Sequence, residues 1–164
     1  MSYVRYIDKT RDYYLKEGYN KPYEWAHFDD VPFAPLTKPL SECCVTIAST
    51  SDIAIRDDDS TGDHTEEMFV GNAYVIPSDT PVDRLYSCQE HFDKHATHLD
   101  DVDSFFPITR LREAEASGRI GSIAKRLHGV HTSYSQRHTL EIDGPLVLER
   151  CREDGVDVAV LTPI

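Results

Sequence analysis

Two short apolar segments, far apart in the chain, constrain the fold most strongly. Residues 44–48 read CVTIA and residues 156–161 read VDVAVL, and both are rich in valine or isoleucine on neighbouring positions. Strands that are covered on both faces have this composition, and they occur mainly in parallel sheets flanked by helices. We therefore expect the two segments to lie parallel in one sheet of an α/β domain, with a further strand over 69–77.

Several segments with helical spacing of apolar residues are expected to cover this sheet. Residues 108–116, 120–127 and 145–153 carry apolar side chains three or four positions apart, and residues 2–17 show the same pattern. The expected fold is α/β, with a mostly parallel sheet in a Rossmann-like three-layer arrangement. A length of 164 residues favours a single domain over 1–164.

A strap rich in proline and aromatic residues separates the first predicted helix from the first predicted strand. Residues 19–40 hold four prolines and five aromatic side chains. Proline at this density excludes a regular helix, and the aromatic rings predict an ordered strap that packs against the domain. His27, Asp29 and Asp30 lie within the strap. They are candidates for a pocket edge, although hydrogen-bonded turn residues have the same pattern.

Small hydroxyl residues follow the first predicted strand directly. Ligands of open α/β sheets collect at the carboxyl ends of the strands. Ser49, Thr50 and Ser51 are therefore candidates for the polar floor of a pocket, while an ordinary hydroxyl-capped turn is the simpler interpretation. The segment Thr162-Pro163 follows the last predicted strand and is expected to emerge on the same rim.

A stretch over 85–98 carries one cysteine and three histidines at spacings of 3, 4 and 3 positions. On a helix these side chains would share an arc of roughly 80°. Thiolate and imidazole groups bind zinc and iron, so the stripe predicts a transition-metal site. An amphipathic helix that buries the same residues beside its leucines needs no metal, and both interpretations stay open. The predicted metal ligands are Cys88, His91, His95 and His98.

The charge and the cysteine pattern limit the classes of partner and compartment. A net charge of -12 and a pI near 5.0 oppose binding to nucleic-acid phosphates. No apolar run approaches the length of a membrane span, and the first residues lack the apolar core of a signal peptide. The four cysteines form no CxxC pair. We expect a cytoplasmic protein with thiols rather than disulfides, and neither nucleic-acid nor membrane partners.

Three long phrases of the sequence and one short one carry a family resemblance. They are YEWAHFDDVPFAPLTKPLSE at 23–42, HFD at 91–93, DVDSFFPITRLREAEASGRIGSIAKR at 101–126 and LERCREDGVDVAVLTPI at 148–164. These phrases resemble the selenoprotein B component of glycine, sarcosine and betaine reductases, and its relative in D-proline reductase. In that family a selenocysteine or cysteine motif downstream of such a segment performs the reduction. The present sequence contains no motif of the type U-x-x-C-x-x-C.

The resemblance implies a small reductase-like or lyase-like enzyme, or an enzyme subunit, that acts on a small polar substrate of amine or thiol type. Histidines beside carboxylates can serve as general bases near neutral pH. We expect the strap and the histidine stretch to meet over the rim of the sheet. The catalytic candidates are His27, Asp29, His91, Asp93 and Cys88, and the candidates for substrate binding are Trp25, Asp30, Ser49, Thr50 and Arg110.

Two other functions fit the same sequence. The chain could be a non-catalytic subunit whose sheet and active site are completed by a separately encoded partner or by a second copy, because a last strand without a neighbour leaves a sheet edge exposed. It could also be a small-molecule binding module that performs no turnover. We therefore expect a homo-oligomer or a partner subunit in addition to a small-molecule ligand.

Overall fold

The computed structural model describes most of the chain and divides it into two compact units. The first unit, Met1–Ala34, contains α1 (Tyr6–Lys16), which confirms the helix predicted over 2–17. The second unit, Pro35–Ile164, contains all other helices and strands among the described residues. The described residues are 6–21, 28–58, 72–90, 92, 94–95, 97–132 and 135–163.

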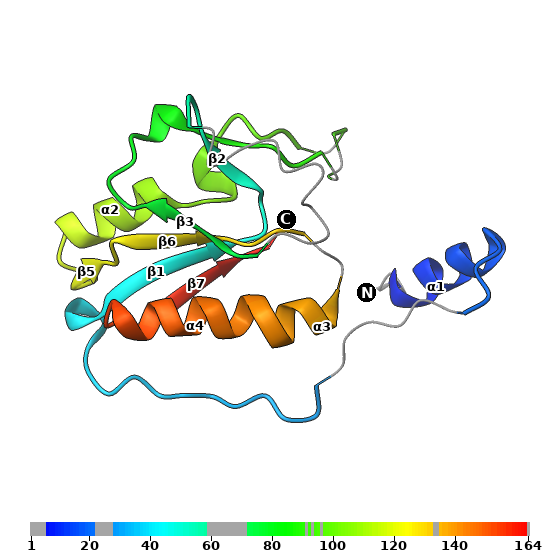
Figure 1. The fold of residues 1–164 in the computed structure, drawn as a ribbon, viewed down its shortest axis with the longest axis horizontal. Coiled ribbons are helices and arrows are strands. Elements are labelled where there is room, and N and C mark those ends of the chain that lie inside the picture. Colours follow the sequence, from blue (N-terminus) through cyan, green and yellow to red (C-terminus); the bar gives the residue numbers. More distant parts are fainter. Residues whose placement is uncertain are drawn as a thin grey trace, which may run out of the picture. The chain divides into compact units, whose positions relative to one another are not determined.

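A mostly parallel sheet forms the centre of the second unit (Figure 1). Strand β1 (Cys44–Ser49) pairs in parallel with β7 (Val158–Thr162), from Val45 opposite Val158 to Ser49 opposite Thr162. The two apolar segments of the sequence are therefore direct neighbours, and their predicted parallel direction is confirmed.

The other edge of β1 carries two short strands in series. β5 (Ser122–Ile123) pairs in parallel with the beginning of β1, and β6 (Arg126–Gly129) pairs in parallel with its end. Because β7 occupies one edge of β1 along most of its length, β5 and β6 share the opposite edge. β3 (Tyr74–Pro77) pairs antiparallel with β6 as the outer strand, within the segment 69–77 that was predicted to be extended.

One face of the sheet is covered by α2 (Ile108–Ala116), whose bounds agree with the prediction. A small antiparallel pair, β2 (Ile53–Ile55) with β4 (Leu85–Ser87), lies on the same side as α2 (Figure 1). Short 3₁₀ helices connect these elements and lie at Leu40–Glu42, Val82–Arg84 and Val102–Ser104.

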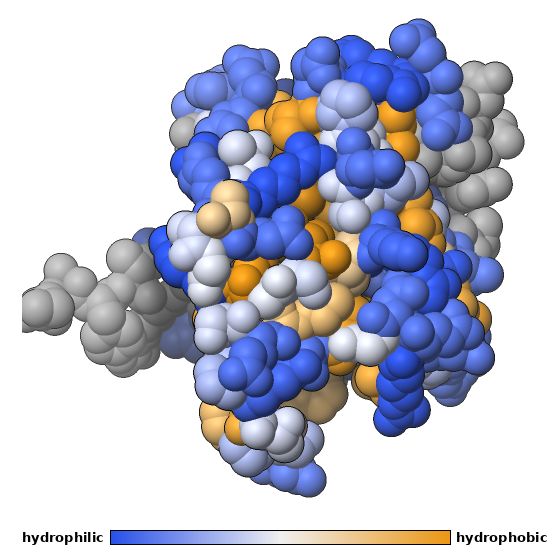
Figure 2. Space-filling model, turned by 90° about the vertical axis from the view of Figure 1, so that its left-hand side faces the viewer, coloured by the Kyte–Doolittle hydropathy of each residue, from blue (hydrophilic) through white to orange (hydrophobic). Residues whose placement is uncertain are grey.

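The main hydrophobic core lies between this face and the elements above it. Ile47 of β1 and Leu127 of β6 point to the face and pack with Phe105 and Phe106, which precede α2. Burial of each such side chain contributes roughly 1.5–3 kcal/mol. Figure 2 views the end at which the parallel strands begin, and it shows apolar residues gathered centrally with charged residues around them.

The opposite face of the sheet is covered by one continuous helix. It consists of α3 (Gln136–His138), a π-helical turn (Thr139–Asp143) and α4 (Gly144–Glu153), which confirms the helix predicted over 145–153. The mixed α/β fold with a mostly parallel sheet is therefore as expected. Among the described residues, no helix combines the length and the apolar character needed to cross a membrane.

The helix predicted over 120–127 is wrong, because these residues lie in β5, β6 and the bend between them. α2 is terminated by Gly118, whose φ of 69° is left-handed. A Cβ on Gly121 would collide with the backbone of Glu42, so the chain passes too close to β1 for a helix. The helical spacing of the apolar residues is overridden here by pairing with the free edge of β1.

The stripe formed by Cys88, His91, His95 and His98 requires a helix, which the described part of this stretch does not form. Leu85–Ser87 is strand β4, and none of the described residues from 88 to 98 is helical. The backbone of this stretch is instead held to the loop after β1, where the Cys88 N–H donates to the Asp52 carbonyl oxygen at 3.0 Å. The predicted helical stripe of metal ligands therefore does not form on the described residues.

The described part of the proline-rich strap forms neither helix nor strand up to Pro39, as its proline content predicts. Val31 and Phe33 are exposed, with 77% and 89% of their surface accessible. The predicted packing of the strap against the domain stays a prediction.

Candidate functional site

The carboxyl ends of β1, β6 and β7 meet at one rim of the sheet. Ser49 Oγ lies 2.9 Å from the carbonyl oxygen of Phe105 and 3.1 Å from that of Thr162. The Thr50 N–H donates to the same Thr162 oxygen at 3.3 Å. The prediction that the residues after the two parallel strands emerge together is therefore confirmed.

The hydroxyl groups at this rim mainly hold its backbone in place. Ser49 and Ser51 are almost completely buried, and the Ser51 N–H donates to Ser49 Oγ at 3.2 Å. Ser87 Oγ donates to the Ser51 carbonyl oxygen at 2.5 Å, and Thr132 Oγ1 donates to the Thr50 carbonyl oxygen at 3.0 Å. These bonds join the small β2–β4 sheet to the main sheet and give the rim a fixed shape.

Asp52 follows these residues in a conformation that is unusual for its type. Its φ is 46°, in the left-handed region, which costs a non-glycine residue of order 1 kcal/mol. The side chain is 10% exposed, and Oδ1 lies 3.6 Å from Nδ1 of His131, whose side chain is 3% exposed. A buried carboxylate beside a buried imidazole is a recurring arrangement for acid–base chemistry.

Tyr74 lies against this pair. Its ring centroid is 4.8 Å from that of His131, and its hydroxyl donates to the Ile53 carbonyl oxygen at 2.8 Å. Burial raises the pKa of the Tyr74 hydroxyl, and the negative charges of Asp52 and Cys88 add to the shift. Tyr74 is therefore a neutral phenol at neutral pH.

Gly129, the last residue of β6, makes room for this ring. A Cβ at this position would overlap the Tyr74 side chain, so only glycine permits the contact. The residues that converge at this place form what we call the rim cluster. Its members are Asp52, Tyr74, Cys88 and His131.

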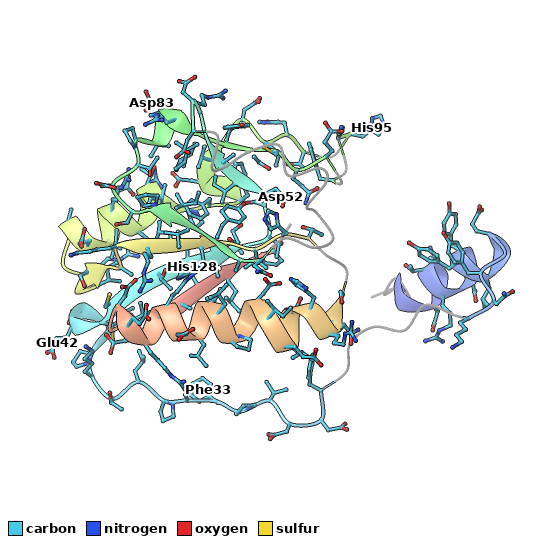
Figure 3. All side chains as sticks on the ribbon, in the orientation of Figure 1. Phe33, Glu42, Asp52, Asp83, His95 and His128 are labelled. Atoms are coloured by element: carbon cyan, nitrogen blue, oxygen red, sulfur yellow. The ribbon has the colours of Figure 1, made fainter. Side chains whose placement is uncertain are left out.

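The rim cluster has the components of a thiol-based site. Cys88 is half-buried and follows β4, next to the Asp52 backbone, while Figure 3 shows Asp52 at the end of the sheet where the parallel strands finish. A histidine that accepts a proton from a thiol leaves a nucleophilic thiolate, and a carboxylate orients that histidine. The adjacent Gln89 is buried and donates to Thr132 Oγ1 at 3.2 Å.

A second cysteine and histidine lie on the opposite face of the sheet, beneath α4. Cys151 Sγ is 3.9 Å from His128 Nε2. Burial and the positive charges of Arg150 and Arg126 lower the pKa of His128 to about 4. Burial raises the pKa of the Cys151 thiol, and Asp154 adds to the shift. Both groups are therefore neutral at neutral pH, which disfavours a thiolate–imidazolium pair here.

The predicted site residues fall into three groups. Cys88, Ser49 and Thr50 lie at the rim, as described above. Arg110 is exposed on α2 and forms ion pairs with Asp103 at 3.3 Å and Glu113 at 2.8 Å. Asp29 and Asp30 are exposed in the first unit. Four predicted site residues lie outside the described residues, namely Trp25, His27, His91 and Asp93. The expected meeting of the strap and the histidine stretch therefore stays a prediction.

The described members of the predicted metal site are not gathered. His98 is exposed and its Nδ1 lies 3.2 Å from Asp100 Oδ2. His95 lies on the loop after β4, well apart from Asp52 (Figure 3). Within the part of the chain that the structure describes, no group of three or more histidine, cysteine or acidic side chains is placed to hold a metal ion. Because the predicted ligand His91 lies outside the described residues, the zinc or iron site stays a prediction.

Sequence reasoning missed Asp52, Tyr74 and His131. Asp52 directly follows the hydroxyl residues that were selected for their place after a strand, and the same rule would have included it. His131 follows β6, but the helix predicted over 120–127 concealed that strand and therefore the position of His131 at a strand end.

Comparisons of the chain with protein-family models, with curated proteins and with solved structures give no match.

Proposed function

We propose that the chain is the α/β part of a thiol-dependent enzyme that uses the rim cluster on a small polar substrate of amine or thiol type. The observation that carries the proposal is the buried Asp52–His131 pair, in which His131 contacts the Tyr74 ring and the Asp52 carbonyl oxygen accepts a hydrogen bond from the Cys88 N–H. The cluster lies at the carboxyl ends of parallel strands, where α/β proteins bind their ligands.

Each member of the cluster has a role in this proposal. His131 accepts the proton of the Cys88 thiol, and the thiolate forms a C–S bond to the substrate carbon as the C–N bond breaks; the amine leaves with the proton that His131 held. Asp52 stabilises the imidazolium that results, as the third member of a triad does. Tyr74 keeps water away from the pair and holds the imidazole ring by its tilted ring contact.

The proposal extends to family and architecture. The phrases quoted above support a relationship to the selenoprotein B component of glycine, sarcosine and betaine reductases. A Rossmann-like three-layer arrangement and a packed strap over the rim are parts of the same proposal. A version assisted by zinc or iron is a separate proposal, which elemental analysis of protein purified without a metal-affinity tag would test.

Binding of the substrates that the resemblance implies tests the proposal. Glycine, sarcosine, betaine and D-proline would each be titrated into protein labelled for NMR. We expect at least one to shift the resonances of Tyr74 and His131, and the Asp52→Asn variant to weaken that binding about tenfold, because it removes the buried negative charge of the cluster. Glu113→Gln, which neutralises an exposed carboxylate on α2, is the matched control and should bind as the wild type does. Equal binding by Asp52→Asn and the wild type would contradict the proposal.

A second candidate, a subunit that pairs with a partner strand, is favoured by β7. Among the described residues β7 pairs only with β1, and Leu161 on this strand is 72% exposed. An edge strand without charges is a template for pairing. Light scattering coupled to size-exclusion chromatography tests this candidate, and a stable monomer at all concentrations would count against it.

A further inference from the structure

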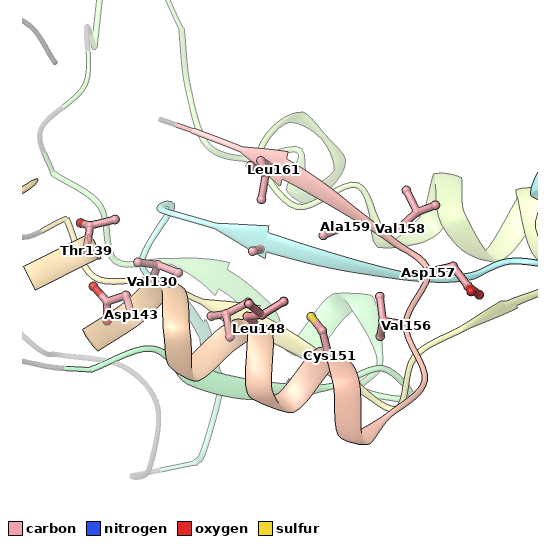
Figure 4. Close-up of a pocket in the computed structure, with 13 residues that line it drawn as sticks. Val130, Thr139, Asp143, Leu148, Cys151, Val156, Asp157, Val158, Ala159 and Leu161 are labelled. Carbon is pink, nitrogen blue, oxygen red and sulfur yellow. The ribbon is translucent and has the colours of Figure 1, made fainter. Parts of the chain in front are cut away.

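An apolar groove lies between α4 and β7, on the face of the sheet opposite α2 (Figure 4). Its volume is about 430 Å³, which falls within the usual range for sites that bind small molecules. The groove does not include any member of the rim cluster.

The walls of the groove explain both its depth and its apolar character. Val147 and Leu148 of α4 form one wall, and Leu161 of β7 forms the other. Between these walls the sheet presents the small side chains of Ala48 and Ala159, which leave space between helix and strand. Leu148 and Leu161 are 49% and 72% exposed. Burying these side chains beneath a ligand would be favourable.

One end of the groove contains a buried carboxylate. The Asp143 side chain is 2% exposed, and its Oδ1 accepts a hydrogen bond from the Ala73 N–H at 2.9 Å. Oδ2 accepts no hydrogen bond from the residues that the structure describes, and the His138 Nε2 atom is 3.6 Å away. Leaving a buried carboxylate oxygen without a donor is unfavourable. Thr139 lies at the same end (Figure 4) and adds a hydroxyl group.

The local helix geometry places Asp143 at this position. Thr139–Asp143 forms a π-helical turn, which interrupts the regular helix just before α4. Such turns have a cost and are frequent at functional sites.

We propose that the groove binds a small amphipathic cation, with its ammonium group at Asp143 and Thr139 and its apolar body against Leu148 and Leu161. This site is separate from the rim cluster, so the inference goes beyond the function proposed above. The net charge of -12 also favours a cationic ligand over an anionic one.

Titration with n-hexylammonium, and with 1-hexanol as its uncharged counterpart, tests the proposal by methyl NMR. Hexylammonium should shift the methyl signals of Leu148 and Leu161 and bind about tenfold more tightly than hexanol, because a charge-assisted hydrogen bond has this effect. Asp143→Asn keeps the shape of the side chain and should reduce the affinity for hexylammonium to that for hexanol.

A second variant keeps the test independent of Asp143. Ala159→Leu fills the groove from the exposed strand β7, so it should abolish binding of both probes while the fold is kept. Leu140→Ala removes an exposed side chain that does not line the groove, and it should leave both affinities unchanged. Hexylammonium should also slow alkylation of Cys151, which lines the groove.

Three results would overturn the proposal. The first is equal binding of hexylammonium and hexanol, or no binding of either probe. The second is an affinity that Asp143→Asn and Ala159→Leu leave unchanged. The third is a stable dimer in which the methyl groups of Leu148 and Leu161 contact a second copy, which would make the groove an interface instead.

Discussion

Two histidines on the same segment of the chain, His128 within β6 and His131 just beyond it, have opposite electrostatic surroundings. Both are almost completely buried. His128 lies beneath α4 near Arg126 and Arg150, and its pKa is lowered to about 4. His131 lies at the rim with its Nδ1 3.6 Å from the Asp52 carboxylate. The two histidines are therefore alike in burial and differ in the sign of the charge beside them, positive at His128 and negative at His131.

The close contact between Gly129 and the Tyr74 ring fixes the position of Tyr74 at the rim. Its loss should have the largest effect on stability. Gly129→Ala places a methyl group inside the Tyr74 ring, which must move away from His131. We expect a loss of about 4 kcal/mol in the free energy of unfolding, measured by urea denaturation. Gly118→Ala, at a left-handed position with free space, is the control and should cost about 1 kcal/mol. Equal losses for the two variants would contradict the steric account of the rim.

The lowered pKa of His128 predicts a specific loss of stability in acid. Below about pH 6.5 the unfolded chain binds a proton at this position, while the folded protein does not bind one until about pH 4. Stability should therefore fall as the pH drops through this window, by about 3 kcal/mol from this group alone. His128→Gln should remove this contribution in urea titrations at a series of pH values. An unchanged pH dependence in the variant would contradict the lowered pKa of His128 in the folded protein.

A smaller effect is expected at the ion pairs that join β6 to the end of α4. Arg126 donates two hydrogen bonds to Asp154, at 2.7 and 2.8 Å, and one to Glu153 at 2.8 Å. Arg126→Gln should lower the stability only modestly, because the side chain is partly exposed and solvent screens its charge. Thermal unfolding in low and high salt would measure the change. Arg110→Gln removes exposed ion pairs of the same type and should cost less; a larger loss there would contradict this ranking.

The sequence predicted the parts of the fold that depend on local composition. Continuous apolar residues identified β1 and β7 as parallel neighbours, and capping and spacing identified α2 and α4. The prediction that β7 is buried was wrong, because Ala159 and Leu161 on this edge strand are exposed. The segment 120–127 was misassigned because its apolar spacing fits a helix, while the pairing with β1 that decides its structure comes from a distant part of the chain. Element type is thus predictable where local and long-range preferences agree.

The candidate site was predicted only in part, and partly for the wrong reason. Cys88 was selected as a metal ligand on a helical stripe, yet it lies at the rim because its backbone N–H bonds to Asp52. The left-handed conformation of Asp52 and the fit of Tyr74 against Gly129 depend on tertiary contacts. No spacing in the sequence encodes these contacts, so the cluster became visible only in the structure.

The pH dependence of Cys88 alkylation tests the central claim, that His131 and Asp52 activate this thiol, most directly. The rate constant with iodoacetamide would be followed by mass spectrometry of the Cys88 peptide, with half-buried Cys44 as the internal reference. We predict that Cys88 reacts about tenfold faster than Cys44 at neutral pH, and that His131→Gln removes this advantage while Cys44 is unaffected. A Cys88 profile that coincides with that of Cys44 and does not change in His131→Gln would contradict the account.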